Sequence, residues 1–212
     1  MDIARFKRRP VMGILRAFGH VPAEELMEAV VSSGLESIEI AMNSDSAASI
    51  IERSAKASRG RLMIGAGTVL SVDMLKLALD AGATFIVSPV LINDVAEYCV
   101  KRAIPFFPGA LTPREIYDAW RSGASMVKVF PAGVFGPRYM KEIKGPLNNI
   151  ELLACGGVNR ENIKEYFDCG ADAVAFGGSI FKKSLLDKRD LSTIEKSIKD
   201  LIDAFETIGS RR

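Results

Sequence analysis

Short apolar segments alternate along the whole chain with longer, polar-faced segments. The apolar segments are rich in β-branched and aromatic residues, which favour strands. The segments between them carry helix start signals, such as Ser71 and Thr112. Eight segments are predicted as strands: residues 11–17, 35–41, 61–67, 84–89, 104–109, 126–132, 150–155 and 172–178.

Eight alternating strand and helix units indicate an α/β protein, the (β/α)8 or TIM barrel, whose parallel strands close on themselves. The 212 residues suit this fold, and no linker divides them. We therefore expect a single barrel domain over residues 1–212. The alternative is an open doubly wound sheet, which usually carries a glycine-rich turn after its first strand. This sequence has no such turn there.

A repeated pattern supports the barrel. A small residue, a glycine and an apolar residue precede a strand four times, with the glycines at positions 34, 82, 123 and 170. Successive glycines are two strand–helix units apart. We expect each of them to end a helix, as glycine commonly does.

The repeat also sets the direction of the strand side chains, because side chains alternate along a strand. Positions four after each glycine are β-branched and are expected to face the helices: Ile38, Ile86, Val127 and Val174. Positions three and five after each glycine are expected to face the barrel interior: Ser37, Phe85, Met126, Ala173, Glu39, Val87, Lys128 and Ala175. The second and sixth strands lie opposite each other in a ring of eight. Glu39 and Lys128 are therefore predicted to face each other near the C-terminal mouth.

This pair suggests chemistry, since active sites of such barrels lie at the C-terminal face. A buried ion pair that serves only the fold is the alternative, but such pairs are rarely net stabilisers. We expect the apolar neighbours of Lys128, such as Phe130, to weaken its preference for the charged form. A neutral amine can attack a carbonyl and form an imine, and Glu39 can then move protons.

Glycine-rich turns follow three strands. Gly156 and Gly157 follow the seventh, and Gly177, Gly178 and Ser179 follow the eighth. Exposed backbone N–H groups at these places are the usual phosphate site of such barrels, although each could be only a tight turn. The segment from Gly65 to Thr68 ends the third strand and suits a carboxylate. Arg16 ends the first strand and could meet a phosphate or carboxylate.

Composition excludes several function classes. His20 is the only histidine, so a serine–histidine–aspartate triad and a multi-histidine metal site are excluded. Net charge is +2 with both signs interspersed, and we expect no nucleic-acid partner. No apolar run approaches the roughly 20 residues that span a membrane, and we see no secretory signal. Cys99, Cys155 and Cys169 are too few for a disulfide framework and fit a cytoplasmic protein. The basic run from Arg5 to Arg9 is expected to form a solvated helix face.

Together, these residues resemble the Schiff-base, class I aldolases of 2-keto-3-deoxy-6-phosphogluconate (KDPG) and 4-hydroxy-2-oxoglutarate (KHG). The matching stretches are GILRA at 13–17, IEIAMNS at 38–44, GAGTVLS at 65–71, VSP at 87–89, PG at 108–109, VKVFPA at 127–132, FGPRYMKEIKGP at 135–146, CGGVN at 155–159 and GGS at 177–179.

The resemblance implies Lys128 as the imine lysine and Glu39 as the general acid–base. It implies a phosphorylated 2-keto acid as substrate, cleaved to pyruvate and glyceraldehyde 3-phosphate, with no cofactor, no metal and a homotrimer. The residues implied at the pyruvyl group and its carboxylate are Thr68, Gly67, Arg16, Pro89 and Phe130. Those implied at the phosphate are Gly156, Gly157, Gly177, Gly178 and Ser179.

Two positions depart from the gluconate-type pattern, which often has arginine at Asn43 and threonine at Cys155. The branch that cleaves the galactonate analogue is similar at Arg16, Glu39 and the Asn43-Ser44 pair. We therefore interpret Asn43 and Cys155 as specificity residues that favour galactonate-like or relaxed selection at C4.

Other activities remain as alternatives. One is cleavage of 4-hydroxy-2-oxoglutarate to pyruvate and glyoxylate. Another is a phosphate-binding barrel decarboxylase or epimerase, although the strand-six lysine lacks the acidic neighbours such enzymes use. A third is a non-catalytic phospho-sugar binder, which would not need Lys128 opposite Glu39.

Overall fold

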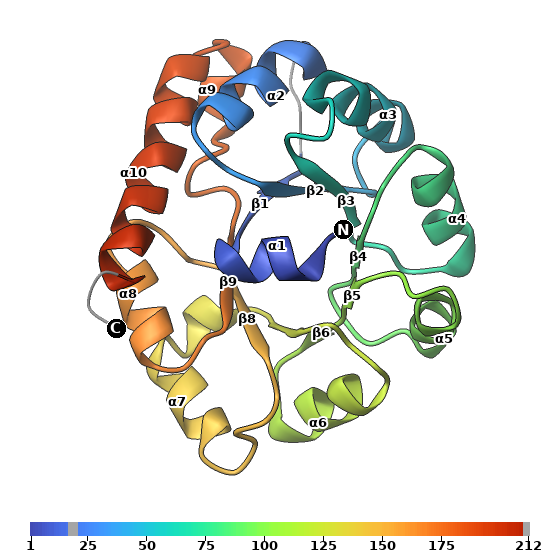
Figure 1. The fold of residues 1–212 in the computed structure, drawn as a ribbon, viewed down its shortest axis with the longest axis vertical. Coiled ribbons are helices and arrows are strands. Elements are labelled where there is room, and N and C mark those ends of the chain that lie inside the picture. The colour runs from blue at the N-terminus through green and yellow to red at the C-terminus, as the bar shows by residue number, and fades with distance from the viewer. Residues whose placement is uncertain (17–20, 210–212) are drawn as a thin grey trace.

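The structure is a computed structural model and describes residues 1–16 and 21–209. Within these residues, nine parallel strands form one sheet in the order β5-β4-β3-β2-β1-β9-β8-β7-β6. The strands are β1 (Val11–Leu15), β2 (Ser37–Ala41), β3 (Met63–Gly67), β4 (Ile86–Val87), β5 (Phe106–Phe107), β6 (Gly109–Ala110), β7 (Val127–Val129), β8 (Leu152–Cys155) and β9 (Ala173–Phe176). The view along the barrel shows these strands ringed by helices (Figure 1).

The predicted fifth strand is split at Pro108, between β5 and β6. Its first half pairs with β4 and its second half pairs with β7. Proline has no N–H to donate to a neighbouring strand, so a strand is commonly interrupted there. The two halves are consecutive in the chain, and the ring therefore closes through this segment. The predicted barrel is confirmed, with eight strand–helix units and one broken strand, and the open doubly wound sheet is ruled out.

Helices connect the strands in chain order. They are α1 (Ile3–Arg8), α2 (Ala23–Ser32), α3 (Ala47–Ser58), α4 (Val72–Asp80), α5 (Asn93–Lys101), α6 (Pro113–Arg121), the short 3-10 helix η1 (Ala132–Val134), α7 (Arg138–Lys144), α8 (Ile163–Asp168), α9 (Lys183–Asp187) and α10 (Leu191–Gly209). Both predicted start signals are N-caps: the Ser71 hydroxyl accepts from the Met74 N–H, and Thr112 forms a capping box with Glu115.

The glycine repeat has the expected role. The four glycines follow helix ends and have positive φ angles of 86°, 99°, 89° and 95° at positions 34, 82, 123 and 170. Glycine adopts this conformation without the steric cost that other residues meet. Each strand after them therefore starts from a fixed register.

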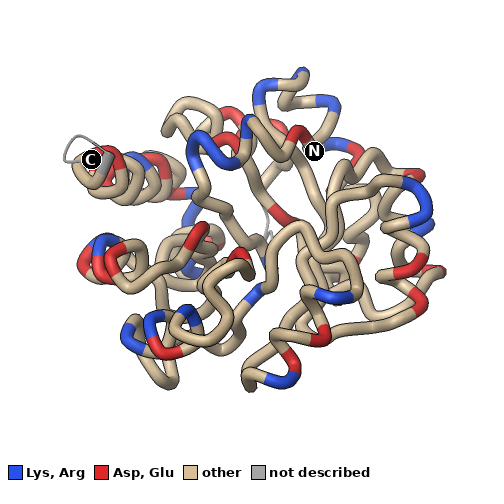
Figure 2. The backbone as a smooth tube through the Cα atoms, turned by 60° about the horizontal axis from the view of Figure 1, so that its bottom comes forward, with Lys and Arg blue, Asp and Glu red and all other residues tan. Residues whose placement is uncertain are grey.

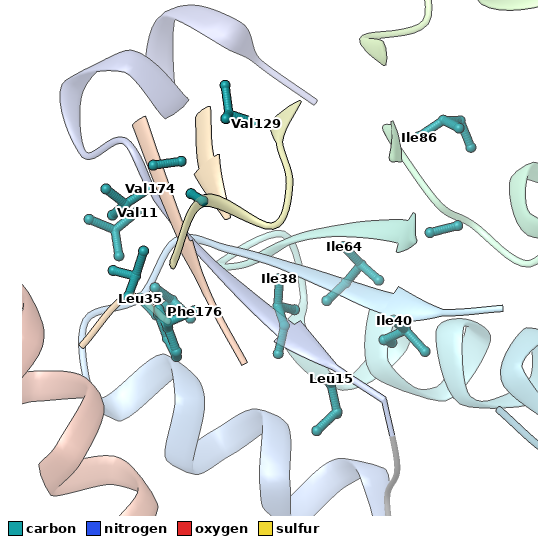
Figure 3. Packing of buried hydrophobic residues seen from close by; sticks show 14 of the residues in the cluster. Val11, Leu15, Leu35, Ile38, Ile40, Ile64, Ile86, Val129, Val174 and Phe176 are labelled. Atoms are coloured by element: carbon teal, nitrogen blue, oxygen red, sulfur yellow. The ribbon is translucent and has the colours of Figure 1, made fainter. Parts of the chain in front are cut away.

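Buried side chains divide into two clusters, as the register predicts. Ile38, Ile86, Val127 and Val174 belong to the cluster between strands and helices, part of which is drawn in Figure 3. Phe85, Val87, Met126, Ala173 and Ala175 belong to a second cluster, inside the barrel. Ser37, Glu39 and Lys128 are also buried.

Helix α1 lies across the N-terminal end of the barrel (Figure 1). Phe6 is fully buried there, and its ring meets the Phe107 ring edge-on at 5.8 Å. Arg5 donates to the Glu36 carboxylate, and Arg9 donates to the Gly34 carbonyl. The expected solvated face is therefore only partly present, because Arg5 and Arg9 are half-buried by these contacts. This end is closed, which leaves the C-terminal end for a site.

Positions of both charge signs are spread over the outer helices (Figure 2). Several of them pair between neighbouring helices and loops, as Arg53 does with Glu24 and Arg61 does with Glu28. No helix within residues 1–16 and 21–209 is long and apolar enough to cross a lipid bilayer.

Candidate active site

Lys128 on β7 and Glu39 on β2 point toward each other inside the barrel. The Lys128 Nζ atom lies 3.5 Å from Oε1 of Glu39, and the two side chains are 3% and 2% exposed. They are the only charged residues that are buried in the described part of the chain. The predicted juxtaposition is thus present, in surroundings where an ion pair is costly to bury.

Glu39 keeps one oxygen free of protein partners. Its Oε2 atom is buried and makes no hydrogen bond within residues 1–16 and 21–209. Buried polar atoms are normally hydrogen-bonded, so an unpartnered carboxylate oxygen suits a group that arrives with a ligand. A substrate hydroxyl or a water could donate to it.

The protonation of Lys128 differs from the expectation. Burial is the largest single effect and lowers the pKa of Lys128, as expected, but the opposing effects, chiefly charge attraction to the Glu39 carboxylate, together raise the net pKa. The amine is therefore held in its charged form while the pair is intact. It must lose a proton before it can attack a carbonyl, and the Glu39 carboxylate is beside it to receive that proton.

Gly67, at the end of β3, gives Glu39 its space. A Cβ atom at position 67 would lie 2.6 Å from Oε1 and 2.8 Å from Cδ of Glu39, closer than real Cβ contacts. The sequence interpretation assigned this glycine to a carboxylate turn and missed the contact. The strand pairing indicates this contact, because Glu39 on β2 pairs with Gly65 on β3, two residues before Gly67.

The glycine turns after β8 and β9 line one cavity of about 280 Å³ at the C-terminal end of the barrel. Nine residues line this cavity, and five of them are the residues predicted to bind phosphate. Its lining residues are Ile14, Arg16, Phe130, Cys155, Gly156, Gly157, Gly177, Gly178 and Ser179. In the described part of the chain, the N–H groups of Gly157, Gly178 and Ser179 donate to no protein acceptor. This wall offers hydrogen-bond donors and one cation to an anion.

Arg16 lies with these turns, although the sequence interpretation grouped it with the pyruvyl residues. The arginine also lowers the pKa of Lys128 through charge repulsion, a smaller effect than those of burial and Glu39. Arg16 therefore shares a cavity with the glycine turns and also acts electrostatically on the amine. Ile14, two residues earlier, was missed; the alternation from Met12 along β1 would have placed it inward.

Phe130 also lines a second cavity. The second cavity, also about 280 Å³, is lined by Pro89, Val90, Leu91, Gly109, Ala110, Leu111, Glu115, Asp118 and Phe130. The Phe130 ring centroid is 5.6 Å from the Lys128 Nζ atom. Pro89 and Phe130 thus line one cavity, and Phe130 also lies beside the amine. Thr68 and Gly67 line neither of these two cavities.

Cys155 lies at the end of β8, where its side chain is buried beside the glycine turn. Burial raises the pKa of the Cys155 thiol to about 11, so the thiol is neutral at physiological pH. Asn43 is exposed in the loop after β2 and lines neither cavity described above. The next residue, Ser44, donates its hydroxyl to the Arg16 carbonyl. His20, for which we expected no role, lies outside the described residues.

Within residues 1–16 and 21–209, no cluster of three or more histidine, cysteine, aspartate or glutamate residues could hold a metal ion. The chemistry that this geometry offers is that of an amine, a carboxylate and an anion-binding wall.

Known proteins match almost the whole chain. The family described as "Aldolase: KDPG and KHG aldolase" matches residues 3–197. A "Probable 2-dehydro-3-deoxy-6-phosphogalactonate aldolase" of Rhizobium meliloti is 33% identical over 178 residues, 84% of this chain and 84% of that protein. The 2-dehydro-3-deoxy-phosphogluconate aldolase of Haemophilus influenzae is 33% identical over 199 residues, 93% of this chain and 92% of that protein.

Solved structures also match the fold of this chain. A solved structure named "Native KDPGal structure" has a TM-score of 0.86 and 28% identity, and the match covers 95% of this chain and 96% of that chain. The barrel, the buried Lys128–Glu39 pair and the glycine-lined cavity occur in a chain whose residues 3–197 fit one family from end to end. The chain belongs to the family of KDPG and KHG aldolases.

Proposed function

We propose that this aldolase cleaves a 2-keto-3-deoxy-6-phospho sugar acid to pyruvate and glyceraldehyde 3-phosphate through a Schiff base on Lys128. One observation carries the proposal: the Nζ atom of a buried lysine lies 3.5 Å from a buried carboxylate. The cavity lined by glycine turns lies at the same end of the barrel. The names of the relatives from Rhizobium meliloti and Haemophilus influenzae agree with this substrate class.

The first half of the reaction forms the imine. Glu39 takes a proton from Lys128, and the neutral amine attacks C2 of the keto acid. The carbinolamine then loses water, with Glu39 returning the proton to the departing oxygen. The protonated imine that results is an electron sink next to C3.

The second half breaks the bond between C3 and C4. The C4 hydroxyl gives its proton to Glu39, directly or through a water, and the C3–C4 electron pair moves toward the iminium nitrogen. Glyceraldehyde 3-phosphate leaves as the aldehyde. The enamine takes a proton at C3, and water hydrolyses the imine to release pyruvate and the free amine.

Substrate orientation follows from the two ends of the site. The phosphate is assigned to the cavity with the glycine turns and Arg16, where N–H groups and a cation converge. The pyruvyl group is assigned to Thr68, Gly67, Pro89 and Phe130, around the amine. The phosphate wall favours a phosphorylated substrate over 4-hydroxy-2-oxoglutarate, which has no phosphate and is the second candidate.

Selection at C4 is assigned to Cys155, with Asn43 in a supporting role. A thiol is a weak hydrogen-bond donor and acts mainly as a small apolar group. Cys155 therefore holds a C4 hydroxyl less strongly than a threonine would, and we propose shallow or galactonate-like discrimination. Cys155 lies in the cavity wall, whereas Asn43 is exposed and would act from the loop.

A homotrimer and a cytoplasmic setting complete the proposal. Large apolar side chains are exposed in the loops after β3, β4 and β7: Leu70, Val90, Val134 and Phe135, at 46%, 50%, 71% and 55%. Apolar exposure of this kind suits a subunit interface. Cys99, Cys155 and Cys169 are free thiols, which fits a reducing compartment. Sedimentation of the purified protein tests the trimer.

Borohydride trapping with pyruvate tests the mechanism. Reduction should fix pyruvate covalently on Lys128, and peptide mass spectrometry should find the adduct there. Lys144, part-buried and paired with Asp172, provides the matched control: Lys144→Met should still be trapped, whereas Lys128→Met should not. An unmodified wild-type protein, or an adduct on another lysine, would end the Schiff-base proposal.

A further inference from the structure

Thr68 has an unusual backbone conformation. Its φ angle is +56°, in the left-handed region. For a β-branched residue this conformation is a genuine outlier and is sustained only where surrounding contacts hold it. Backbone strain of this kind occurs at functional sites, and Thr68 directly follows the glycine that abuts the Glu39 carboxylate.

Hydrogen bonds hold the backbone on both sides of Thr68. Before it, the Gly67 carbonyl accepts from the Met42 N–H at 2.8 Å. After it, the Val69 N–H donates to the Val87 carbonyl at 3.2 Å. The Ser88 hydroxyl then donates to the Val69 carbonyl at 2.7 Å. The left-handed residue is thus fixed between the ends of β2 and β4.

Among the residues that make these hydrogen bonds, Ser88 uses its side-chain hydroxyl, whereas the others use backbone groups. It is fully buried, and its own N–H donates to the Phe107 carbonyl at 3.2 Å. It therefore links the segment after β3 to β4 and β5. Without this hydroxyl, the Val69 carbonyl would lose its partner in a buried setting, and only the two backbone hydrogen bonds would hold the chain on either side of Thr68.

We propose that Ser88 is a positioning residue of the aldolase site, which holds Thr68 in its left-handed conformation so that Thr68 binds the pyruvyl end of the keto acid beside Glu39. The proposal rests on the proposed function. Ser88 itself does not touch substrate. It acts through the Val69 carbonyl, and its loss affects binding of the keto acid.

The test compares Ser88→Ala with Ser37→Ala. Ser37 is also fully buried, and its hydroxyl donates to the Val11 carbonyl at 3.1 Å, at the opposite end of the barrel. Both variants lose one buried hydroxyl-to-carbonyl bond. We expect similar losses of melting temperature. Only Ser88→Ala should raise KM for the sugar acid and the pyruvate concentration that half-saturates borohydride trapping, each by about tenfold, the effect of roughly one hydrogen bond.

A double-variant cycle identifies the route. Because Ser88 acts through Thr68, the variant with Ser88→Ala and Thr68→Ala should have the same KM as Thr68→Ala alone. Should Ser88→Ala fail to fold, Ser88→Cys keeps the volume with a weaker donor and should show the same KM effect. Equal KM values for Ser88→Ala and Ser37→Ala, or multiplying effects in the cycle, overturn the positioning role. A wild type that is not trapped by borohydride overturns the proposed function instead.

Discussion

Gly67 and Glu39 touch across the space between β3 and β2: a Cβ atom on the glycine would lie 2.6 Å from the carboxylate Oε1. The φ angle of Gly67 is not in the left-handed region, so the backbone alone would accept alanine. Glu39 can therefore keep its position only because residue 67 has no side chain.

Gly67→Ala should therefore fold and lose activity. The added methyl group displaces the Glu39 carboxylate from the amine, and a misplacement of about 1 Å can cost about 10²-fold in rate. Steady-state kcat measures the loss. Gly145→Ala is the control, because a Cβ there meets only ordinary contacts at 3.4 Å or more. Wild-type kcat in Gly67→Ala would show that Glu39 can move without consequence.

Glu39→Gln should change both the rate and the pH dependence. General acid–base catalysis typically contributes about 10²–10⁴-fold, so kcat should fall by that order. The carboxylate raises the pKa of Lys128 against the lowering effect of burial. Its removal leaves burial dominant, and the Lys128 pKa should fall. The rate of borohydride trapping with pyruvate should then reach its plateau at lower pH than in the wild type, and an unchanged pH profile would contradict this account.

The same pair should limit stability. Replacing a buried ion pair by apolar residues of similar size is often neutral or stabilising by about 1–4 kcal/mol, whereas breaking it costs about 3–5 kcal/mol. The inactive double variant Lys128→Met with Glu39→Leu should unfold at a urea concentration no lower than that of the wild type. Glu39→Leu alone should unfold earlier.

Alkaline pH should widen the difference in stability between the double variant and the wild type. The folded-state pKa of Lys128 is raised from 10.5, so its contribution to stability is fully present below pH 10.5 and is lost as the pH rises through the folded-state pKa. The double variant has no Lys128, so its stability does not fall with pH for this reason. A gap that narrows as the pH rises would show that the pKa of Lys128 is not raised in the folded protein.

Gly178→Asp should weaken phosphate binding and leave the amine intact. A Cβ at position 178 meets no atom within 4 Å, so the added carboxylate fits sterically and repels the phosphate. KM for the phosphorylated sugar acid should rise by at least about tenfold, the loss of one charge-assisted bond. Trapping with unphosphorylated pyruvate should be unaffected, and Gly178→Ala should resemble the wild type. Equal losses with both ligands would place the phosphate elsewhere.

Cys155→Thr should shift selection at C4 toward the gluconate epimer. The threonine hydroxyl supplies a hydrogen bond that the thiol supplies only weakly, worth about 1–3 kcal/mol in the ratio of kcat/KM for the two epimers. The ratio is measured in wild type and variant. A wild type that already prefers the gluconate epimer by several orders of magnitude, or an unchanged ratio in the variant, would remove Cys155 from specificity.

The register of the barrel was predictable because it depends on local rules. Gly34 and Gly123 end helices in a conformation that glycine favours, and strand alternation then directs Glu39 and Lys128 inward. Features that depend on contacts between distant segments were not predictable. They include the direction of the Lys128 pKa, which a balance between burial and charge attraction determines, and the contact between Gly67 and the Glu39 carboxylate.

Two further differences have the same cause. The chemistry of Pro108 marks a break in a strand, but only the pairing with β4 on one side and β7 on the other shows that the barrel closes through it. The basic residues around Phe6 suggested a solvated helix. Their partners lie far along the chain, from Glu36 to Glu206, and no local pattern identifies them.

Helix α1 has a consequence for the order of assembly. It precedes every strand of the barrel in the chain, yet Phe6 packs against Phe107, Lys7 pairs with Glu151 and Arg9, directly after the helix, pairs with Glu206. Contacts so distant in sequence form slowly, because long loops must close, at a cost in chain entropy, before these contacts can stabilise the fold. Full docking of α1 therefore requires segments as far along the chain as β5, β8 and α10, and we expect it to be a late event in folding.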